Sequence, residues 1–182
     1  GSEIDPTLIK IASLSANLQK QSLELFHQDS LRPLLIDPVD LVVADLPVGY
    51  YPDDVRAQDF ELKAEEGHAY AHHLLIEQSL NYTKEDGYLI FLIPEFLFSS
   101  DQAEKLYHYL KKTAHIIGVI RLPDSMFKAK NQVKSILILQ KQGDMKAPKQ
   151  PLLVDMPSFS DTAAIADILK KINDWFTQYG EE

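Results

Sequence analysis

The chain has 182 residues, of which 45% are hydrophobic and 25% charged, a composition typical of a soluble globular domain. It has no cysteine, which excludes disulfides and cysteine-based zinc or thiol chemistry and fits a cytoplasmic protein. It also has no apolar run near the ~18 residues that a transmembrane helix needs, so no transmembrane helix is expected. Its formal net charge of −9 is unlike that of strong nucleic-acid binders, so a role on DNA would need a basic patch or a further domain.

The first predicted element is a helix that begins at Asp5-Pro6, because aspartate is a preferred N-cap and proline a preferred first helical residue. An amphipathic spacing of apolar residues carries this helix to about Lys20. A short strand over 23–27 is then predicted, ended by Gln28-Asp29-Ser30. The next strand covers 39–44 and is rich in valine and leucine.

A long polar loop over 49–66 precedes a predicted helix over 69–82. Asp86-Gly87 is interpreted as a turn, followed by an apolar strand over 88–93 that ends at Pro94. A helix over 101–112, with Ser100 or Asp101 as its cap, leads to strands over 115–121 and 134–141, which are close enough along the chain to pair antiparallel.

The C-terminal part is predicted to contain a short strand over 152–154 and a helix from Asp161 to about Tyr179. That helix has the clearest apolar stripe of the chain, and we expect its Trp175 and Phe176 to pack in the core.

The alternation of strands and helices, with strands apolar on both faces, favours a layered α/β domain. Its sheet is expected to be mainly parallel, with an antiparallel edge strand. We expect a single domain over 1–182, in which 1–150 form the motif-bearing core and 151–182 add the last strand and helix.

The segment 45–52, which reads Asp-Leu-Pro-Val-Gly-Tyr-Tyr-Pro, directly follows the strand over 39–44. Ligands bind beyond the carboxyl ends of strands in open parallel sheets, so this segment is a candidate site. Acidic residues also follow two earlier strands: Glu3, with Asp5 near it, and Asp29. In doubly wound folds such carboxylates commonly bind the ribose and the base of a nucleotide-like cofactor.

Each of these residues also has a purely structural interpretation. Asp45-Leu46-Pro47 can be turn chemistry, Asp5 a helix cap, and Asp29 with Ser30 a hydrogen-bonding pair at the start of a loop.

The motifs Glu3-Ile4-Asp5-Pro6, Gln28-Asp29-Ser30 and Asp45-Leu46-Pro47 resemble successive motifs of class I S-adenosylmethionine-dependent N6-adenine DNA methyltransferases. The strand over 87–94 resembles the strand that follows in that family, and the segments 117–127 and 135–141 are similar to the modification subunits of type I restriction systems. The resemblance implies a partial Rossmann-like class I fold, because the family's first strand and Gly-rich loop would precede Gly1.

The family motif is (Asn/Asp/Ser)-Pro-Pro-(Tyr/Phe/Trp), in which Asp45 stands at the first position and Pro47 at the third. The resemblance implies that Asp45 and the Leu46 carbonyl activate the target amine. Val48 replaces the aromatic residue, so Tyr50 or Tyr51 is expected to stack on a base flipped out of the duplex.

The resemblance also implies that Glu3 binds the ribose of S-adenosylmethionine and Asp29 its adenine, with Ile4 and Ser30 as further cofactor-binding residues. Phe127 is either a core residue or a second contact to the flipped base.

Two other groups of side chains admit a functional reading. His68 and His72 have a spacing that can share a zinc ion, but no third ligand is evident, so capping or solvated histidines and no metal are expected. Lys128, Lys130 and Lys134 are either a solvated edge or a phosphate contact.

The resemblance favours a methyltransferase that acts on the N6 amine of adenine in DNA in a longer protein, which would bind DNA through other regions. The chain alone is expected to be inactive, because its cofactor site is incomplete. The alternatives are a methyltransferase for another amine, on RNA, a protein or a small molecule, and a non-catalytic binding module. A homodimer is one way to cover the exposed sheet edge that the truncation implies.

Overall fold

The computed structural model describes residues 1–129 and 132–180, so Lys130, one of the three candidate lysines, lies outside the described residues. The chain forms two compact units, Gly1–Asp37 and Pro38–Glu182, and each is described by itself. A single domain over 1–182 stays a prediction.

The first unit contains the strand β1 (Ser2–Glu3), the helix α1 (Pro6–Leu18) and the strand β2 (Phe26–His27). The side chain of Asp5 accepts the backbone N–H groups of Thr7 and Leu8 at 2.7 and 3.0 Å, and these bonds lower the pKa of Asp5. The predicted start of the helix is therefore confirmed.

The apolar face of α1 has little to pack against within its own unit. Among its residues only Ala16 is buried, while Leu8, Ile11, Leu14 and Leu18 are exposed. The predicted amphipathic helix is present, and its apolar stripe is not part of a core formed by the first unit.

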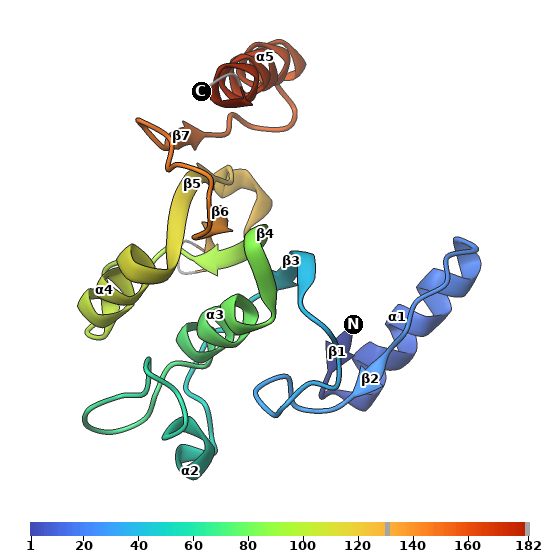
Figure 1. Cartoon of the computed structure of the whole chain (residues 1–182). Helices are drawn as coiled ribbons and strands as arrows, with labels where there is room; N and C mark the ends of the chain where they lie inside the picture. The colour runs from blue at the N-terminus through green and yellow to red at the C-terminus, as the bar shows by residue number, and fades with distance from the viewer. Residues whose placement is uncertain (130–131, 181–182) are drawn as a thin grey trace. The chain divides into compact units, whose positions relative to one another are not determined.

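The second unit is built on a five-stranded sheet of order β3-β4-β6-β5-β7 (Figure 1). Its strands are β3 (Val39–Asp45), β4 (Thr83–Pro94), β5 (Ala114–Arg121), β6 (Lys134–Lys141) and β7 (Leu152–Asp155). β3 runs parallel to β4 and β5 runs parallel to β7, whereas β6 is antiparallel to both of its neighbours. The α/β class and the antiparallel pairing are confirmed, but the antiparallel strand is the third of five and not an edge strand.

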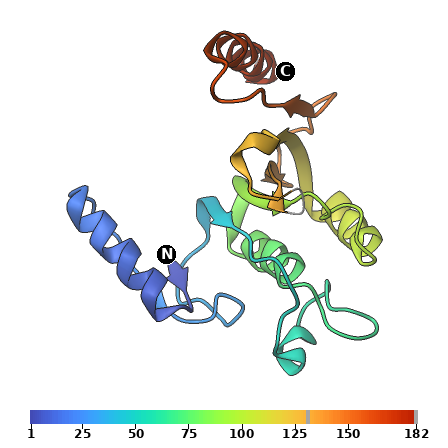
Figure 2. The same ribbon diagram turned by 180° about the vertical axis from the view of Figure 1, so that it is seen from behind.

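Helical segments lie between these strands and after the last one. They are α2 (Asp54–Ala57), α3 (Ala71–Asn81), α4 (Ala103–Thr113), the 3-10 turn η1 (Asp124–Met126) and α5 (Thr162–Gly180). α3 contacts β4 and α4 contacts β5, as the views from both sides show (Figures 1 and 2). The core between these helices and the sheet includes fully buried Leu74, Ile76, Leu89, Phe91, Leu106 and Ile117.

Asp86-Gly87, predicted to be a turn, lies inside β4. The pairing of β4 with β3 is irregular here, and Asp86 has a φ of 62°. A Cβ on Gly87 would lie 2.9 Å from the carbonyl oxygen of Lys84 on β4 and 3.0 Å from that of Asp40 on β3, so glycine fits the crowded backbone at this irregularity. The cap of α4 also differs from the prediction, because it is Gln102 and not Ser100 or Asp101.

β3 is the outermost strand of the described sheet and pairs only with β4. Leu41 and Val43 on this strand are exposed. The free edge of β3 therefore combines unpaired backbone groups with apolar side chains.

The final helix α5 matches its predicted range closely but is not a core helix. Phe176 is 37% exposed, and Trp175 is half-buried with its ring against Phe176 and Tyr179. The prediction that Trp175 and Phe176 pack in the core is therefore wrong. No helix among the described residues is long and apolar enough to cross a membrane.

Candidate active site

Asp45 is the last residue of β3, and the chain leaves the sheet one residue later. The backbone N–H of Leu46 donates to the carbonyl oxygen of Leu92 at 3.0 Å, and the Leu46 side chain is buried. A proline could not make this bond, because it has no backbone N–H. Leucine in place of the family's first proline thus extends the pairing of β3 with β4 by one residue.

The Asp45 carboxylate is exposed and forms an ion pair with Lys134, between Oδ1 and Nζ. Lys134 is the first residue of β6, so its side chain reaches past the end of β4 to contact β3. Lys134 is thus neither a plain solvated lysine nor a free cation.

The loop after Pro47 is held by backbone hydrogen bonds to the segment before α3. Tyr51 N–H donates to the carbonyl of Ala69 at 2.8 Å, and Ala71 N–H donates to the carbonyl of Gly49 at 3.0 Å. Gly49 has a φ of 134°, a conformation that side-chain-bearing residues rarely adopt. The predicted polar loop over 49–66 is therefore anchored at its start and includes the short helix α2.

The two tyrosines of this loop have opposite environments. Tyr50 is 57% exposed and stacks on Tyr70, with ring centroids 4.8 Å apart and planes at 18°. Tyr70 in turn stacks on His72 at 5.0 Å. Tyr51 is only 7% exposed and cannot offer a ring face to a ligand.

His72 and His73 lie fully buried at the start of α3, and none of their ring nitrogens has a hydrogen-bond partner in the described part of the chain. Burial lowers the pKa of His72 to about 4, an effect that the nearby Pro47 carbonyl partly offsets. Burial and the neighbouring His72 lower the pKa of His73 to about 3. Both imidazoles are therefore neutral at physiological pH.

A zinc site would need His68 and His72 to face the same ion, but the two side chains have different environments. His68 is exposed, and its Nδ1 contacts Oδ1 of Asp54 at 2.8 Å, whereas His72 is buried. Over residues 1–129 and 132–180, no group of three or more histidine or acidic side chains could hold a metal ion.

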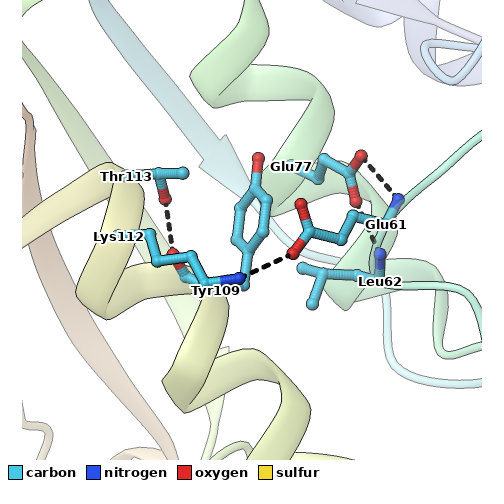
Figure 3. A network of polar contacts seen from close by, with 6 residues as sticks. All are labelled: Glu61, Leu62, Glu77, Tyr109, Lys112 and Thr113. Atoms are coloured by element: carbon cyan, nitrogen blue, oxygen red, sulfur yellow. Dashed lines mark hydrogen bonds and ion pairs between the residues drawn. The ribbon is translucent and has the colours of Figure 1, made fainter.

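The buried carboxylate of Glu77 holds the end of the loop that precedes α3 (Figure 3). Both oxygens of Glu77 on α3 accept backbone N–H groups, from Glu61 and Leu62, each at 2.8 Å. Burial raises the pKa of Glu77. Lys112 on α4 contacts Glu61 at 3.4 Å, so the segment that leads back to Tyr70 is tied to both helices.

Val48 and Phe127 are weaker candidates than Tyr50 for stacking on a base. Val48, at the family's aromatic position, is 56% exposed and has no ring, and Phe127 is half-buried after η1. Near Phe127, Arg121 is paired with Glu95 at 3.2 Å and Asp124 at 2.6 Å, and these two partners raise the pKa of Arg121.

In the first unit, Glu3 and Asp29 follow neighbouring parallel strands, because Glu3 of β1 is paired with His27 of β2. One oxygen of Glu3 accepts the N–H of Asp5 at 2.7 Å, and one of Asp29 accepts that of Leu31 at 2.9 Å. Ser30 donates to the hydroxyl of Ser2 at 3.0 Å, which joins the two strand ends. Ile4 is exposed beside Glu3.

Sequence reasoning found the loop but not all of its partners. The structure places Asp45, Leu46, Pro47 and Tyr50 on one loop and adds Lys134, Tyr70 and His72 around them. The sequence marks Lys134 as a candidate residue at the start of the strand over 134–141. Only the order of the strands in the sheet shows that it lies within reach of Asp45.

Comparison with known proteins shows which family the whole sequence matches. The family model for N-6 DNA Methylase matches residues 1–180. The uncharacterized protein YtxK of Bacillus subtilis (strain 168) is 56% identical over 177 residues, which are 97% of this chain and 54% of that protein. The crystal structure of a proposed class I S-adenosylmethionine-dependent methyltransferase from Listeria monocytogenes matches with a TM-score of 0.90 and 49% identity, over 97% of this chain and 55% of that one.

A more distant structure shares the fold. It is the modification subunit of a proposed type I restriction enzyme from Vibrio vulnificus YJ016, with a TM-score of 0.70 and 14% identity, over 97% of this chain and 40% of that one. The chain thus spans about half the length of the relatives that it matches at high identity.

Proposed function

Because the chain belongs to the N-6 DNA methylase family, we propose that it is the catalytic part of an S-adenosylmethionine-dependent methyltransferase that acts on the N6 amine of adenine in DNA. One observation carries the proposal: an exposed carboxylate, Asp45, ends β3 on the same loop as an exposed aromatic ring, Tyr50, that is supported from behind. An enzyme of this kind works in the cytoplasm, where bacterial DNA lies.

Asp45 and the Leu46 carbonyl supply two neighbouring acceptors for the two hydrogens of the amine. The nitrogen of an adenine amine is a poor nucleophile, because its lone pair is delocalised into the ring. Hydrogen bonds to both hydrogens favour a more nucleophilic nitrogen, and holding it in line with the methyl group is then a matter of orientation. Asp45 also stands where it can accept the proton that the nitrogen loses after it gains the methyl group.

Tyr50 takes the role of the stacking residue in this proposal. Its ring is largely exposed and is held by stacking on Tyr70, so a flat base would lie against it at little cost in ordering. The buried position of Tyr51 leaves this role to Tyr50. Phe127 is retained as a candidate second contact, since it is half-buried directly after η1 and part of its ring is accessible.

Glu3, Ile4, Asp29 and Ser30 would hold the cofactor. Two carboxylates at neighbouring strand ends, next to an exposed apolar side chain, suit the hydroxyls, amino group and ring of an adenosine. When bound, S-adenosylmethionine supplies a methyl group on a positively charged sulfur that leaves as a neutral thioether.

A second candidate is methylation of an amine outside DNA, and two observations favour it. Val48 stands at the family's aromatic position, and Lys134 and Arg121 are each paired with acidic side chains. Neither of these two cations is therefore free for a phosphate backbone, and the net charge of the chain is −9.

The test is methyl transfer by the full-length protein. Purified protein with S-adenosylmethionine labelled in its methyl group is incubated with mixed-sequence duplex DNA, RNA, a protein extract and free adenosine. Label in N6-methyladenine of DNA, identified after digestion, supports the first candidate, and label only in another fraction supports the second. The absence of label from every fraction would contradict both.

A further inference from the structure

We propose that Lys134 is a positioning residue, which holds Oδ1 of Asp45 so that Oδ2 is presented to the target amine. The inference rests on the proposed function and adds a residue to it. Lys134 comes from a strand that is not adjacent to β3, and the contact joins residues 89 positions apart in the chain.

The strand register explains how the two residues meet. β4 lies between β3 and β6, with Asp45 paired to Leu92 and Lys134 paired to Pro94. The Lys134 side chain therefore crosses the carboxyl end of β4 to reach Asp45. It is only 23% exposed, which is low for a lysine, so its stem is held against the sheet end.

The pairing leaves one side of the carboxylate open. Within residues 1–129 and 132–180, Lys134 is the hydrogen-bond partner of Asp45 Oδ1, and Oδ2 has none. A carboxylate that is fixed at one oxygen has less freedom to rotate, so the other oxygen and the Leu46 carbonyl are held ready for the two amine hydrogens.

Two alternatives for Lys134 fit the structure less well. A contact to substrate phosphate requires a cation that is free, whereas this ammonium is engaged by Asp45. A role in stability alone is a weak explanation, because the Asp45 side chain is 60% exposed and exposed ion pairs contribute little to folding.

The chain contains a matched control. Lys84 of β4 pairs with Asp40 of β3 at 2.8 Å, which is a lysine–aspartate pair between neighbouring strands near the opposite end of β3. Lys84→Met removes such a pair without touching the loop after Asp45.

The experiment measures kcat and KM for DNA methylation by the full-length protein and its Lys134→Met, Lys134→Arg and Lys84→Met variants. We expect Lys134→Met to lower kcat by about tenfold or more with KM for DNA within about twofold, because orientation and not binding is lost. Lys134→Arg should restore part of kcat, and Lys84→Met should equal the parent. A Lys134→Met variant as active as the parent would overturn the inference.

A double-mutant cycle with Asp45→Asn separates positioning from an independent contact. If Lys134 acts through the carboxylate, Lys134→Met costs little further activity once Asp45 is an amide, so the effects are not multiplicative. Multiplicative effects would show that Lys134 acts on the substrate instead. If Lys134→Met does not fold, Lys134→Gln takes its place in the cycle. A parent protein that transfers no methyl group would contradict both the proposed function and this inference.

Discussion

The ring of Tyr50 lies flat against the ring of Tyr70, with their centroids 4.8 Å apart, while the next side chain along the chain, Tyr51, points into the interior. The loop thus presents one aromatic surface, and the backbone bridge between residues 50 and 70 keeps it in place. In the proposed enzyme this ring, two residues after the valine at position 48, would take the place of the missing aromatic side chain.

Replacement of Tyr50 by alanine should weaken substrate capture in the full-length protein. Stacking of a base on an aromatic side chain contributes about 1–3 kcal/mol, so kcat/KM should fall by roughly 5- to 150-fold. Tyr50→Phe should retain most activity, since the ring face is kept. Tyr107→Ala removes another exposed tyrosine, on α4, and serves as the control. Equal activity of Tyr50→Ala and the parent would rule out the stacking role.

Replacement of Asp45 by alanine should abolish most methyl transfer but leave the fold intact, because the side chain is exposed. Loss of one positioned hydrogen-bonding group in an active site costs on the order of 100- to 1,000-fold in kcat. Asp45→Asn should be less severe, since an amide oxygen still accepts from the amine. The measurement is label incorporation at saturating cofactor, with circular dichroism to verify folding. Full activity of Asp45→Ala would place the chemistry elsewhere.

Acid should unfold the second unit through His72 and His73. Their folded-state pKa values are lowered to about 4 and about 3 from an unfolded value near 6.5, so the unfolded chain binds more protons. Stability is then full above pH 6.5 and falls as the pH drops toward the folded pKa values, by roughly 2 kcal/mol per histidine at pH 5.

Urea unfolding between pH 7.5 and pH 5 tests this directly. His73→Phe should remove about half of the pH dependence, because phenylalanine fills the site without titrating. His108→Phe is the control, as His108 is exposed on α4. A His73→Phe variant that keeps the whole pH dependence would refute the assignment.

Glu77→Ala should destabilise the second unit, because the backbone N–H groups of Glu61 and Leu62 lose their acceptors. Leaving two such groups without partners costs roughly 2–4 kcal/mol in the free energy of unfolding. Glu77→Gln should cost less, since one oxygen remains. Glu104→Ala changes an exposed glutamate on α4 and should have little effect. Denaturant unfolding of the three variants gives the comparison, and equal midpoints would show that the network in Figure 3 contributes nothing.

If Glu3 and Asp29 bind the cofactor, substitutions of either residue should weaken the binding of S-adenosylmethionine but not that of the methylation target. Glu3→Gln and Asp29→Asn should each weaken S-adenosylmethionine binding by about tenfold in the full-length protein, the usual scale for a hydrogen bond to a charged group. Isothermal titration calorimetry measures this, with Asp37→Asn as a control at an exposed acidic residue. Unchanged affinity in both variants would remove these residues from the cofactor site.

The strand ends could be predicted from the sequence, because apolar runs and the polar residues after them mark where each strand leaves the sheet. Asp45 is the clearest case, since the run before it is almost entirely apolar. The choice between Tyr50 and Tyr51 could not be made, because it depends on a backbone bridge to a segment about twenty residues away.

Other features depend on the order of the strands in space. Lys134 is far from Asp45 in sequence, and only the placement of β4 between β3 and β6 brings the two together. Asp86-Gly87 has the composition of a turn, and its position inside β4, where the pairing with β3 is irregular, is visible only once the strands are paired.

The open side of β3 has a practical consequence for anyone who handles this polypeptide in solution. Unpaired backbone groups beside exposed Leu41 and Val43 are a template for an added strand, including the same edge of a second molecule. We therefore expect self-association to increase with protein concentration, and a strand-forming peptide that pairs with this edge to reduce it.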